Sequence, residues 1–99
     1  MSRLIHDLQF PKATTDLTGN KLGRKIYSTQ VKPNLDENAE NIVQIPESIN
    51  DVGTSFIQGM YYEISEKYGR DNALKIMKLS TNNKKTLEKI NKSIRIYGI

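Results

Sequence analysis

Residues 42–68, IVQIPESINDVGTSFIQGMYYEISEKY, carry the strongest structural signals in this chain. The short apolar run at residues 42–45 is ended by Pro46, which is consistent with a buried central strand. After a polar connection, residues 55–68 predict an amphipathic helix with one wide apolar face. Gly69 stands where a helix commonly ends in a left-handed residue. The apolar residues that repeat every four positions on this helix are Phe56, Met60, Ile64 and Tyr68.

The carboxy-terminal third continues the alternation of strand and helix. Residues 73–79, ALKIMKL, alternate well enough for a strand, and residues 80–83 supply turn and capping side chains. A final helix is predicted over residues 83–96, because its apolar residues share one face and lysines occupy the rest. The apolar residues on that face are Leu87, Ile90 and Ile94. An order of strand, helix, strand and helix requires right-handed crossovers and a sheet covered by helices.

The amino-terminal part of the chain carries weaker signals. Residues 4–10 alternate in hydrophobicity and predict a strand that closes at Pro11. Apolar residues at helical spacing predict a helix over residues 20–31, although Gly23 within it disfavours helix formation. Pro33 should end that helix, since a proline disfavours helical geometry in the residue before it.

The length of 99 residues fits a single domain that can bury a modest core without a metal or disulfides. We therefore expect one α/β domain over residues 1–99, with a small mixed sheet and about three helices packed on it. Residues 1–19 are expected to form an N-terminal strand and loop extension. Within it, residues 12–19, KATTDLTG, are loop-like.

The composition narrows the kinds of chemistry open to the chain. It contains no cysteine, which removes disulfides, thiolate zinc sites and cysteine nucleophiles. The single histidine, His6, is expected to be structural because no second ligand accompanies it, so we predict neither a metal nor a cofactor. No apolar run approaches the roughly 18 residues that span a bilayer, and His6 and Asp7 interrupt the apolar start of the chain. A cytoplasmic protein without membrane association is expected.

The net charge of +4 is unevenly distributed along the chain. Residues 75–95 contain seven lysine or arginine residues and one acid, Glu88, which leaves the remainder of the chain net negative. Such an arrangement suits an oriented contact with a partner, whereas the solvated faces of a strand and a helix are the simpler explanation. The basic surface that could contact nucleic acid comprises Lys78, Lys84, Lys85, Lys89, Lys92 and Arg95.

The connection INDVGTSF, residues 49–56, combines an acid, a glycine and two hydroxyl residues at the start of the predicted helix. The start of a helix offers unpaired backbone N–H groups and the positive end of the helix dipole. Thr54 or Ser55 can therefore act as the helix cap, with Asp51 and Gly53 forming the turn. A phosphate added to either hydroxyl would also be electrostatically favourable there. Both interpretations remain open at this point.

The run from residue 42 to residue 64, IVQIPESINDVGTSFIQGMYYEI, resembles the core of the STAS-like domains, the fold of bacterial anti-sigma factor antagonists. It is most similar to the STAS-like family of unknown function, whose members show an apolar strand, a connection and a Ser/Thr-Ser-Phe step into an amphipathic helix. Here that step is GTSF at residues 53–56. The later block ALKIMKLSTNNKKTLEKINKSI also resembles the family, so the similarity covers about residues 20–96.

The resemblance carries implications for function. In anti-sigma factor antagonists the serine at this step is phosphorylated by a partner kinase, which switches binding off. The resemblance therefore implies that Thr54 or Ser55 is the phosphoacceptor and that the partner is a kinase-like ATPase or another signalling protein. The partner-binding loop that it implies consists of Asp51, Gly53, Thr54, Ser55 and Phe56.

These observations favour a non-enzymatic regulatory module that binds a protein partner and binds no nucleotide itself. The alternative is a small basic protein, for instance an inhibitor from a phage or mobile element, that contacts nucleic acid through its lysine-rich strand and helix. A third interpretation is a decayed domain that serves only as an assembly surface. The position of the lysines separates the first two interpretations. Lysines that share one flat face favour the nucleic-acid alternative, and lysines that are spread around the helix disfavour it. The lysines that decide this are Lys78, Lys85, Lys89 and Lys92.

Overall fold

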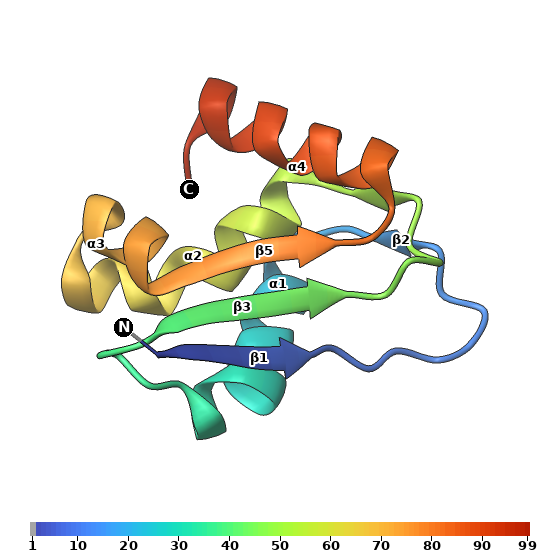
Figure 1. Ribbon diagram of the computed structural model, residues 1–99. Helices are drawn as coiled ribbons and strands as arrows, with labels where there is room; N and C mark the ends of the chain where they lie inside the picture. Colours follow the sequence, from blue (N-terminus) through green and yellow to red (C-terminus); the bar gives the residue numbers. More distant parts are fainter. Residues whose placement is uncertain (1) are drawn as a thin grey trace.

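Five strands and four α-helices make up residues 2–99, the part of the chain that the computed structural model describes. The first half contains β1 (Arg3–Asp7), β2 (Asp16–Leu17), α1 (Asn20–Ile26), a π-helical turn (Tyr27–Val31), a 3-10 turn (Lys32–Asn34) and β3 (Glu40–Ile45). The second half contains β4 (Asp51–Val52), α2 (Thr54–Tyr68), α3 (Arg70–Ile76), β5 (Met77–Thr81) and α4 (Lys84–Tyr97). The α/β class is confirmed, with four α-helices in place of about three (Figure 1).

The strands form two sheets in which every described pairing is parallel. The larger sheet has the order β1-β3-β5, and β2 pairs with β4 in a separate two-stranded sheet. The expectation of a mixed sheet is therefore wrong. A helical connection returns the chain to the same end of the larger sheet before each new strand begins, and this makes neighbouring strands parallel. Figure 1 shows α1 and α2 on the same side, behind the sheet.

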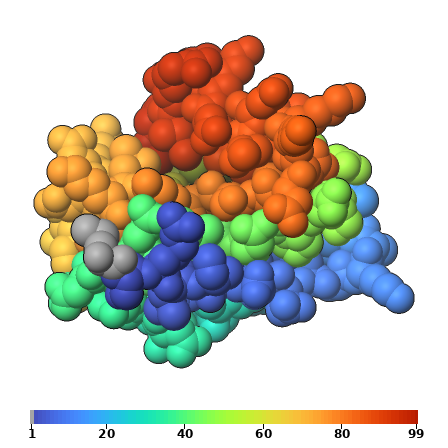
Figure 2. Space-filling model, viewed as in Figure 1, coloured from blue at the N-terminus to red at the C-terminus, as the bar shows by residue number. Residues whose placement is uncertain are grey.

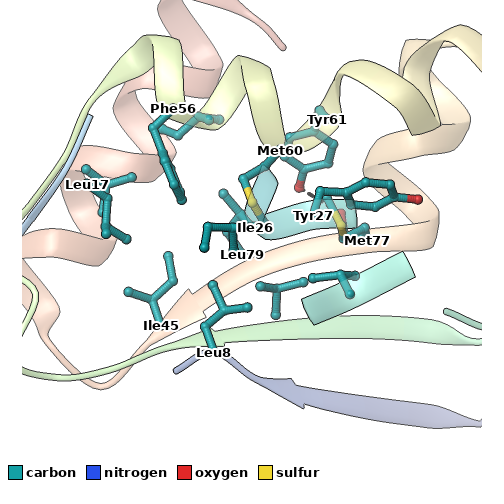
Figure 3. Close-up of a cluster of buried hydrophobic side chains, with 14 of the residues drawn as sticks. Leu8, Leu17, Ile26, Tyr27, Ile45, Phe56, Met60, Tyr61, Met77 and Leu79 are labelled. Carbon is teal, nitrogen blue, oxygen red and sulfur yellow. Dashed lines mark hydrogen bonds between the residues drawn. The ribbon is translucent and has the colours of Figure 1, made fainter. Parts of the chain in front are cut away.

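The hydrophobic core lies between the larger sheet and the helices α1 and α2 (Figure 3). Alternate residues of β3 and β5 point into it, and the buried ones are Val43, Ile45, Met77 and Leu79. From α2, the side chains of Phe56, Met60 and Ile64 are buried, which confirms the predicted helix face. α2 begins one residue earlier than expected and ends at Tyr68, and the positive φ of 88° at the following C-cap residue, Gly69, suits a glycine.

The opposite face of the larger sheet is left open by the described helices (Figures 1 and 2). Its side chains alternate with the buried ones, and Ile5, Ile42 and Lys78 all keep exposed surface there. Arg3 Nε and Lys78 Nζ contact the carboxylate of Glu40 at 3.2 and 3.3 Å. Because parallel sheets are usually covered on both faces, an open face of this kind invites a functional explanation.

The helices α1 and α2 pack with their backbones in close contact. A side chain on Gly23 of α1 would overlap the carbonyl oxygen of Phe56, and one on Gly59 of α2 would overlap that of Asn20. Gly23 weakens the helix as an isolated element, but it permits the close approach that buries the core.

The helix predicted over residues 20–31 changes geometry along its length. α1 is regular to Ile26, a π-helical turn follows, and Lys32 begins a 3-10 turn. Pro33 lies in the first turn of that 3-10 segment, where its missing N–H is tolerated. Helical structure therefore ends one residue after Pro33, at Asn34, rather than before it.

The strand predicted over residues 73–79 is wrong for most of its length. The chain re-enters a helix, α3, directly after Gly69, and β5 begins only at Met77. Asn72 Nδ2 donates to the carbonyl oxygen of Tyr68 at 3.0 Å and so joins α3 to the end of α2. The apolar residues of this segment fit helical spacing as well as strand alternation, and short runs cannot separate the two. They are Ala73, Leu74, Ile76 and Met77.

The amino-terminal extension takes part in both sheets. β1 ends at Asp7, before the expected end at residue 10, and Leu8 N continues the contact by donating to Gln44 O at 3.0 Å. Residues 12–19, which were expected to be a loop, contain β2. A two-residue strand has too few positions to show alternation, so the sequence offered no signal for it.

The single histidine is buried and contacts a buried amide. His6 is buried on the covered side of β1, and its Nε2 lies 2.9 Å from Asn41 Oδ1. The two N–H bonds of the Asn41 amide are shared among the carbonyl oxygens of Asp36, Ala39 and Ile76, at 2.7, 3.2 and 3.0 Å from Nδ2. Asn41 thus joins the ends of β3, β1 and α3 through one buried amide.

Candidate partner-binding site

The connection that leads from β4 into α2 is held by the amino-terminal extension. Gly53 N donates to Leu17 O at 2.8 Å, and Asn50 N donates to Thr15 O at 2.7 Å. Gly53 is the N-cap of α2 and has extended geometry, with φ −71° and ψ 151°. The short β2-β4 pairing therefore sets the position at which α2 begins.

The two hydroxyl residues, Thr54 and Ser55, are the first residues of α2, and neither is its cap. Thr54 Oγ1 and Ser93 Oγ of α4 form a hydrogen bond of 2.8 Å, whereas Ser55 Oγ accepts from Gly19 N at 3.2 Å. The interpretation of one hydroxyl as the cap is thus corrected. Glycine is acceptable at the N-cap, which leaves both side chains free to contact neighbouring elements. Ser55 is exposed and Thr54 is half-buried.

The predicted partner-binding loop divides into surface and core residues. Asp51 and Ser55 are exposed, and Gly53 and Thr54 are half-buried. Phe56 has 0% exposed surface and points into the core beneath α2 (Figure 3). Phe56 therefore has no side-chain surface for a partner, because it begins the apolar face that holds α2 on the sheet.

The helix α4 is seated against the loop that precedes β4. Asn83 is the N-cap of α4: its Oδ1 accepts from Thr86 N at 3.2 Å, and its Nδ2 donates to Glu47 O at 3.1 Å. Thr86 Oγ1 donates to Ile49 O at 2.8 Å. The capping role of Asn83 could be predicted from its position before a helix. Its contact with a loop more than thirty residues away has no local signal in the sequence.

The six basic residues predicted as one surface divide into two groups. Lys78 lies on the open face of the sheet, where it contacts Glu40. The other five lie on the exposed side of α4, opposite its buried residues. On that side Lys85, Lys89 and Lys92 share one helical row, since residues spaced by three and four positions are neighbours. Lys84 and Arg95 occupy the adjacent row, which Glu88 interrupts.

The lysine row of α4 borders the start of α2. Lys89 Nζ lies 3.8 Å from Asp51 Oδ1, and the bond between Thr54 and Ser93 joins the two helices beside it. We call the combined area the junction surface. It consists of Asp51, Gly53, Thr54 and Ser55 together with Lys85, Lys89 and Lys92.

A hollow lies beside the π-helical turn and the carboxyl end of α2, lined by residues that include Tyr27 and Tyr68. Two of its charged groups form an ion pair, with Lys32 Nζ 2.8 Å from Glu63 Oε2, and the Tyr68 hydroxyl donates to Glu37. Burial, with a smaller contribution from the Glu63 carboxylate, raises the pKa of Tyr27 to about 12. The Tyr27 hydroxyl therefore stays neutral at ordinary pH, and this hollow is a weaker candidate for a charged partner than the junction surface.

Within residues 2–99, no three His, Asp or Glu side chains gather as metal ligands would, and no helix is long and apolar enough to cross a bilayer. Comparisons of the chain with protein-family models, with curated proteins and with solved structures find no match. The STAS-like resemblance of residues 42–64 therefore stays a prediction, and the α/β architecture rests on the structure described above.

Proposed function

We propose that this chain is a non-enzymatic regulatory module that binds a protein partner through the junction surface, and that phosphorylation of Ser55 switches this binding. The observation that carries the proposal is the exposed position of Ser55 in the first turn of α2, directly after Thr54 and close in sequence to Asp51, the two residues that contact Ser93 and Lys89 of α4. The STAS-like resemblance of the sequence suggests a kinase-like ATPase or another signalling protein as the partner.

A binding role, rather than a catalytic one, is supported by the surroundings of Ser55. The nucleophilic serine of an enzyme requires a neighbouring base that takes its proton. Among the described residues the Ser55 hydroxyl has one hydrogen-bond partner, the backbone N–H of Gly19. An N–H group can orient the hydroxyl but cannot accept its proton.

The geometry favours Ser55 over Thr54 as the phosphoacceptor. Thr54 is half-buried and its hydroxyl is bonded to Ser93, so a phosphate there would have to separate α2 from α4. A phosphate on Ser55 would instead lie in solvent beside the unpaired N–H groups at the start of α2. Its charge of about −1.5 to −2 would also be attracted to the helix dipole. The modified protein should therefore fold normally while presenting a changed surface.

The test is a pull-down from the native host that compares the parent with Ser55→Ala, Ser55→Asp and Ser28→Asp. Ser28 is an exposed serine of the π-helical turn, so Ser28→Asp adds the same charge away from the junction surface. We expect Ser55→Asp to lose a partner that the other three forms retain, at equal folded concentration. If Ser55→Asp keeps every partner of the parent, Ser55 is not a switch.

Nucleic acid is the second candidate ligand, because Lys85, Lys89 and Lys92 share one row on α4. Contacts of this kind neutralise phosphates without reading bases, so binding should fall steeply between low and physiological salt. Fluorescence anisotropy with duplex and single-stranded DNA measures this dependence for the parent, for Lys85→Glu and for the control Lys25→Glu on α1. Tight, sequence-selective binding at physiological salt that Lys85→Glu abolishes would favour nucleic acid over a protein partner.

A further inference from the structure

The strand β1 has a free edge. It lies at one side of the sheet order β1-β3-β5, and within residues 2–99 no strand pairs with its outer side. Leu8 N donates to Gln44 O, and Glu40 N donates to Ser2 O, so even-numbered residues direct their backbone groups toward β3. In a strand successive residues alternate in this direction. The N–H and C=O groups of Arg3, Ile5 and Asp7 therefore point outward.

This edge has few of the features that prevent strands from pairing. Natural proteins protect exposed edges with short strands, charged side chains (lysine above all), proline, bulges or covering segments, and of these β1 has a short length and two charges, Arg3 and Asp7. β1 contains neither proline nor lysine, and its register with β3 is regular over all five residues. Leu4 and Ile5 are 36% and 51% exposed. Figure 2 shows the β1 segment, in dark blue, at the surface of the open face.

The charges of β1 are arranged symmetrically about Ile5. The strand reads Arg-Leu-Ile-His-Asp, with Arg3 two residues before Ile5 and Asp7 two residues after it. The three side chains lie on the open face, because they pair in register with Glu40, Ile42 and Gln44. Arg3 contacts Glu40 at 3.2 Å, whereas Asp7 has no ion-pair partner among the described residues.

We propose that β1 pairs antiparallel with β1 of a second copy of this chain, about a two-fold axis that passes through Ile5. In this register Ile5 lies opposite Ile5 of the second copy, and Arg3 lies opposite Asp7 of the second copy at both ends. Each opposed pair has outward N–H and C=O groups, so each can exchange both backbone hydrogen bonds. The two three-stranded sheets become one continuous sheet.

Other registers would leave backbone groups or charges of the β1 edge unmatched. A shift of one residue places outward groups of one strand opposite inward groups of the other, which breaks the ladder. A shift of two residues places Arg3 or Asp7 opposite Ile5 and leaves a charge unmatched. Parallel pairing in register would set outward residues opposite outward residues, whereas in the parallel β1-β3 ladder outward Arg3 is opposite Glu40, whose N–H points toward β1. The charge pattern of β1 thus selects its own copy as the occupant of the edge.

The open face supports the same pairing. Ile42 lies beside Ile5 on the neighbouring strand, so the dimer would carry a row of four isoleucines across its centre. Glu40 would remain compensated when Arg3 turns toward the second copy, because Lys78 also contacts it at 3.3 Å. The β1 edge is separate from the junction surface. β1 and β5 are the two edge strands of the sheet, and α4 packs against β5, at the edge opposite β1. This inference therefore does not depend on the proposed function.

The first test measures the mass of the full chain in solution by sedimentation equilibrium. The protein should shift from its chain mass of 11.3 kDa toward twice that value as the concentration rises over a roughly hundredfold range up to about 1 mM. A mass that stays at that of one chain throughout this range would overturn the proposal.

A charge-exchange experiment tests the register. Asp7→Arg alone opposes arginine to arginine, and Arg3→Asp alone opposes aspartate to aspartate, so each variant should remain monomeric where the parent is dimeric. Their equimolar mixture restores both opposite-charge pairs and should dimerise again. Glu66→Arg, an exposed position on α2, makes the same charge change away from β1 and should dimerise like the parent. Dimers of Asp7→Arg alone, or a mixture that stays monomeric, would contradict the proposed pairing.

Discussion

The two faces of the β1-β3-β5 sheet place similar residues in very different surroundings. Ile45 and Ile42 lie on the same strand, yet Ile45 is completely buried under the helices and Ile42 keeps exposed surface on the open face. The covered face also holds Asn41, whose amide is fully bonded, while Gln44 faces the other way. The comparison indicates that the covered face supplies most of the stability and that the open face and its edge stay accessible to solvent.

The largest expected effect is the difference in unfolding free energy between alanine variants of the two isoleucines, Ile45 and Ile42. Ile45→Ala removes buried methyl groups and leaves a cavity, so it should cost about 2–5 kcal/mol of the free energy of unfolding. Ile42→Ala removes partly solvated groups and should cost below about 1 kcal/mol. Urea unfolding at low protein concentration measures both. Equal losses would show that the two faces contribute alike and would break the comparison.

A second experiment addresses how the covered face is closed. Gly59→Ala forces a methyl group against the carbonyl oxygen of Asn20 and should cost about 1–3 kcal/mol, although alanine favours helices. Gly53→Ala is the matched control, because its methyl group would meet only ordinary contacts and its φ of −71° suits alanine. We expect Gly53→Ala to change stability by about 0.5 kcal/mol or less. A harmless Gly59→Ala would mean that α1 and α2 do not approach as closely as described.

The polar residues of β3 give a third comparison. Asn41→Ala removes one side of five hydrogen-bond contacts, including those to buried His6 and to the carbonyl oxygen of Ile76, at a cost of about 1–3 kcal/mol. Gln44→Ala, on the open face, should stay within about 0.5 kcal/mol of the parent. Thermal unfolding of the two variants distinguishes them. If Gln44→Ala is the more damaging change, the assignment of the two faces is reversed.

The smallest effect concerns pH and the open face. A hydrogen bond from Lys78 and its positive charge, with a further contribution from Arg3, hold the pKa of Glu40 below its usual range. A lowered pKa contributes stability above the unfolded pKa, and this contribution is lost as the pH falls through the lowered value. The stability difference between the parent and Glu40→Gln should therefore be small at neutral pH and vanish in acid. Urea unfolding across this pH range measures it, and a difference that grows in acid would contradict the assignment.

The sequence was most informative where one periodic pattern extended over many residues. α2 and α4 were each predicted to within one residue at both ends, because their apolar stripes repeat over several turns. Residues 73–79 were misassigned because a short apolar run fits both a helix and a strand. β2 was missed because two residues have no periodicity, and yet its contact with the connection around Gly53 sets where α2 begins.

The candidate site, like the fold, could be predicted from the sequence only in part. The sequence placed hydroxyl residues at a helix start and a lysine-rich face on the last helix, since both depend on local order along the chain. Only the tertiary structure separated Ser55, which is exposed, from Thr54, which is bonded to Ser93 of another helix. It also brought Asp51 to Lys89, a contact that joins the two regions into one surface.

What the sequence by itself determined is therefore the α/β class, the two long helices with their buried faces, and the basic character of the last helix. These follow from hydrophobic periodicity and charge, which are properties of neighbouring residues. The tertiary structure alone decided that the strands of residues 2–99 pair in parallel, that one sheet face is left open by the helices of that part, and that Arg3, Ile5 and Asp7 share a free edge. Such features depend on contacts between segments far apart in the chain, because long-range packing rather than local propensity selects which strands become neighbours.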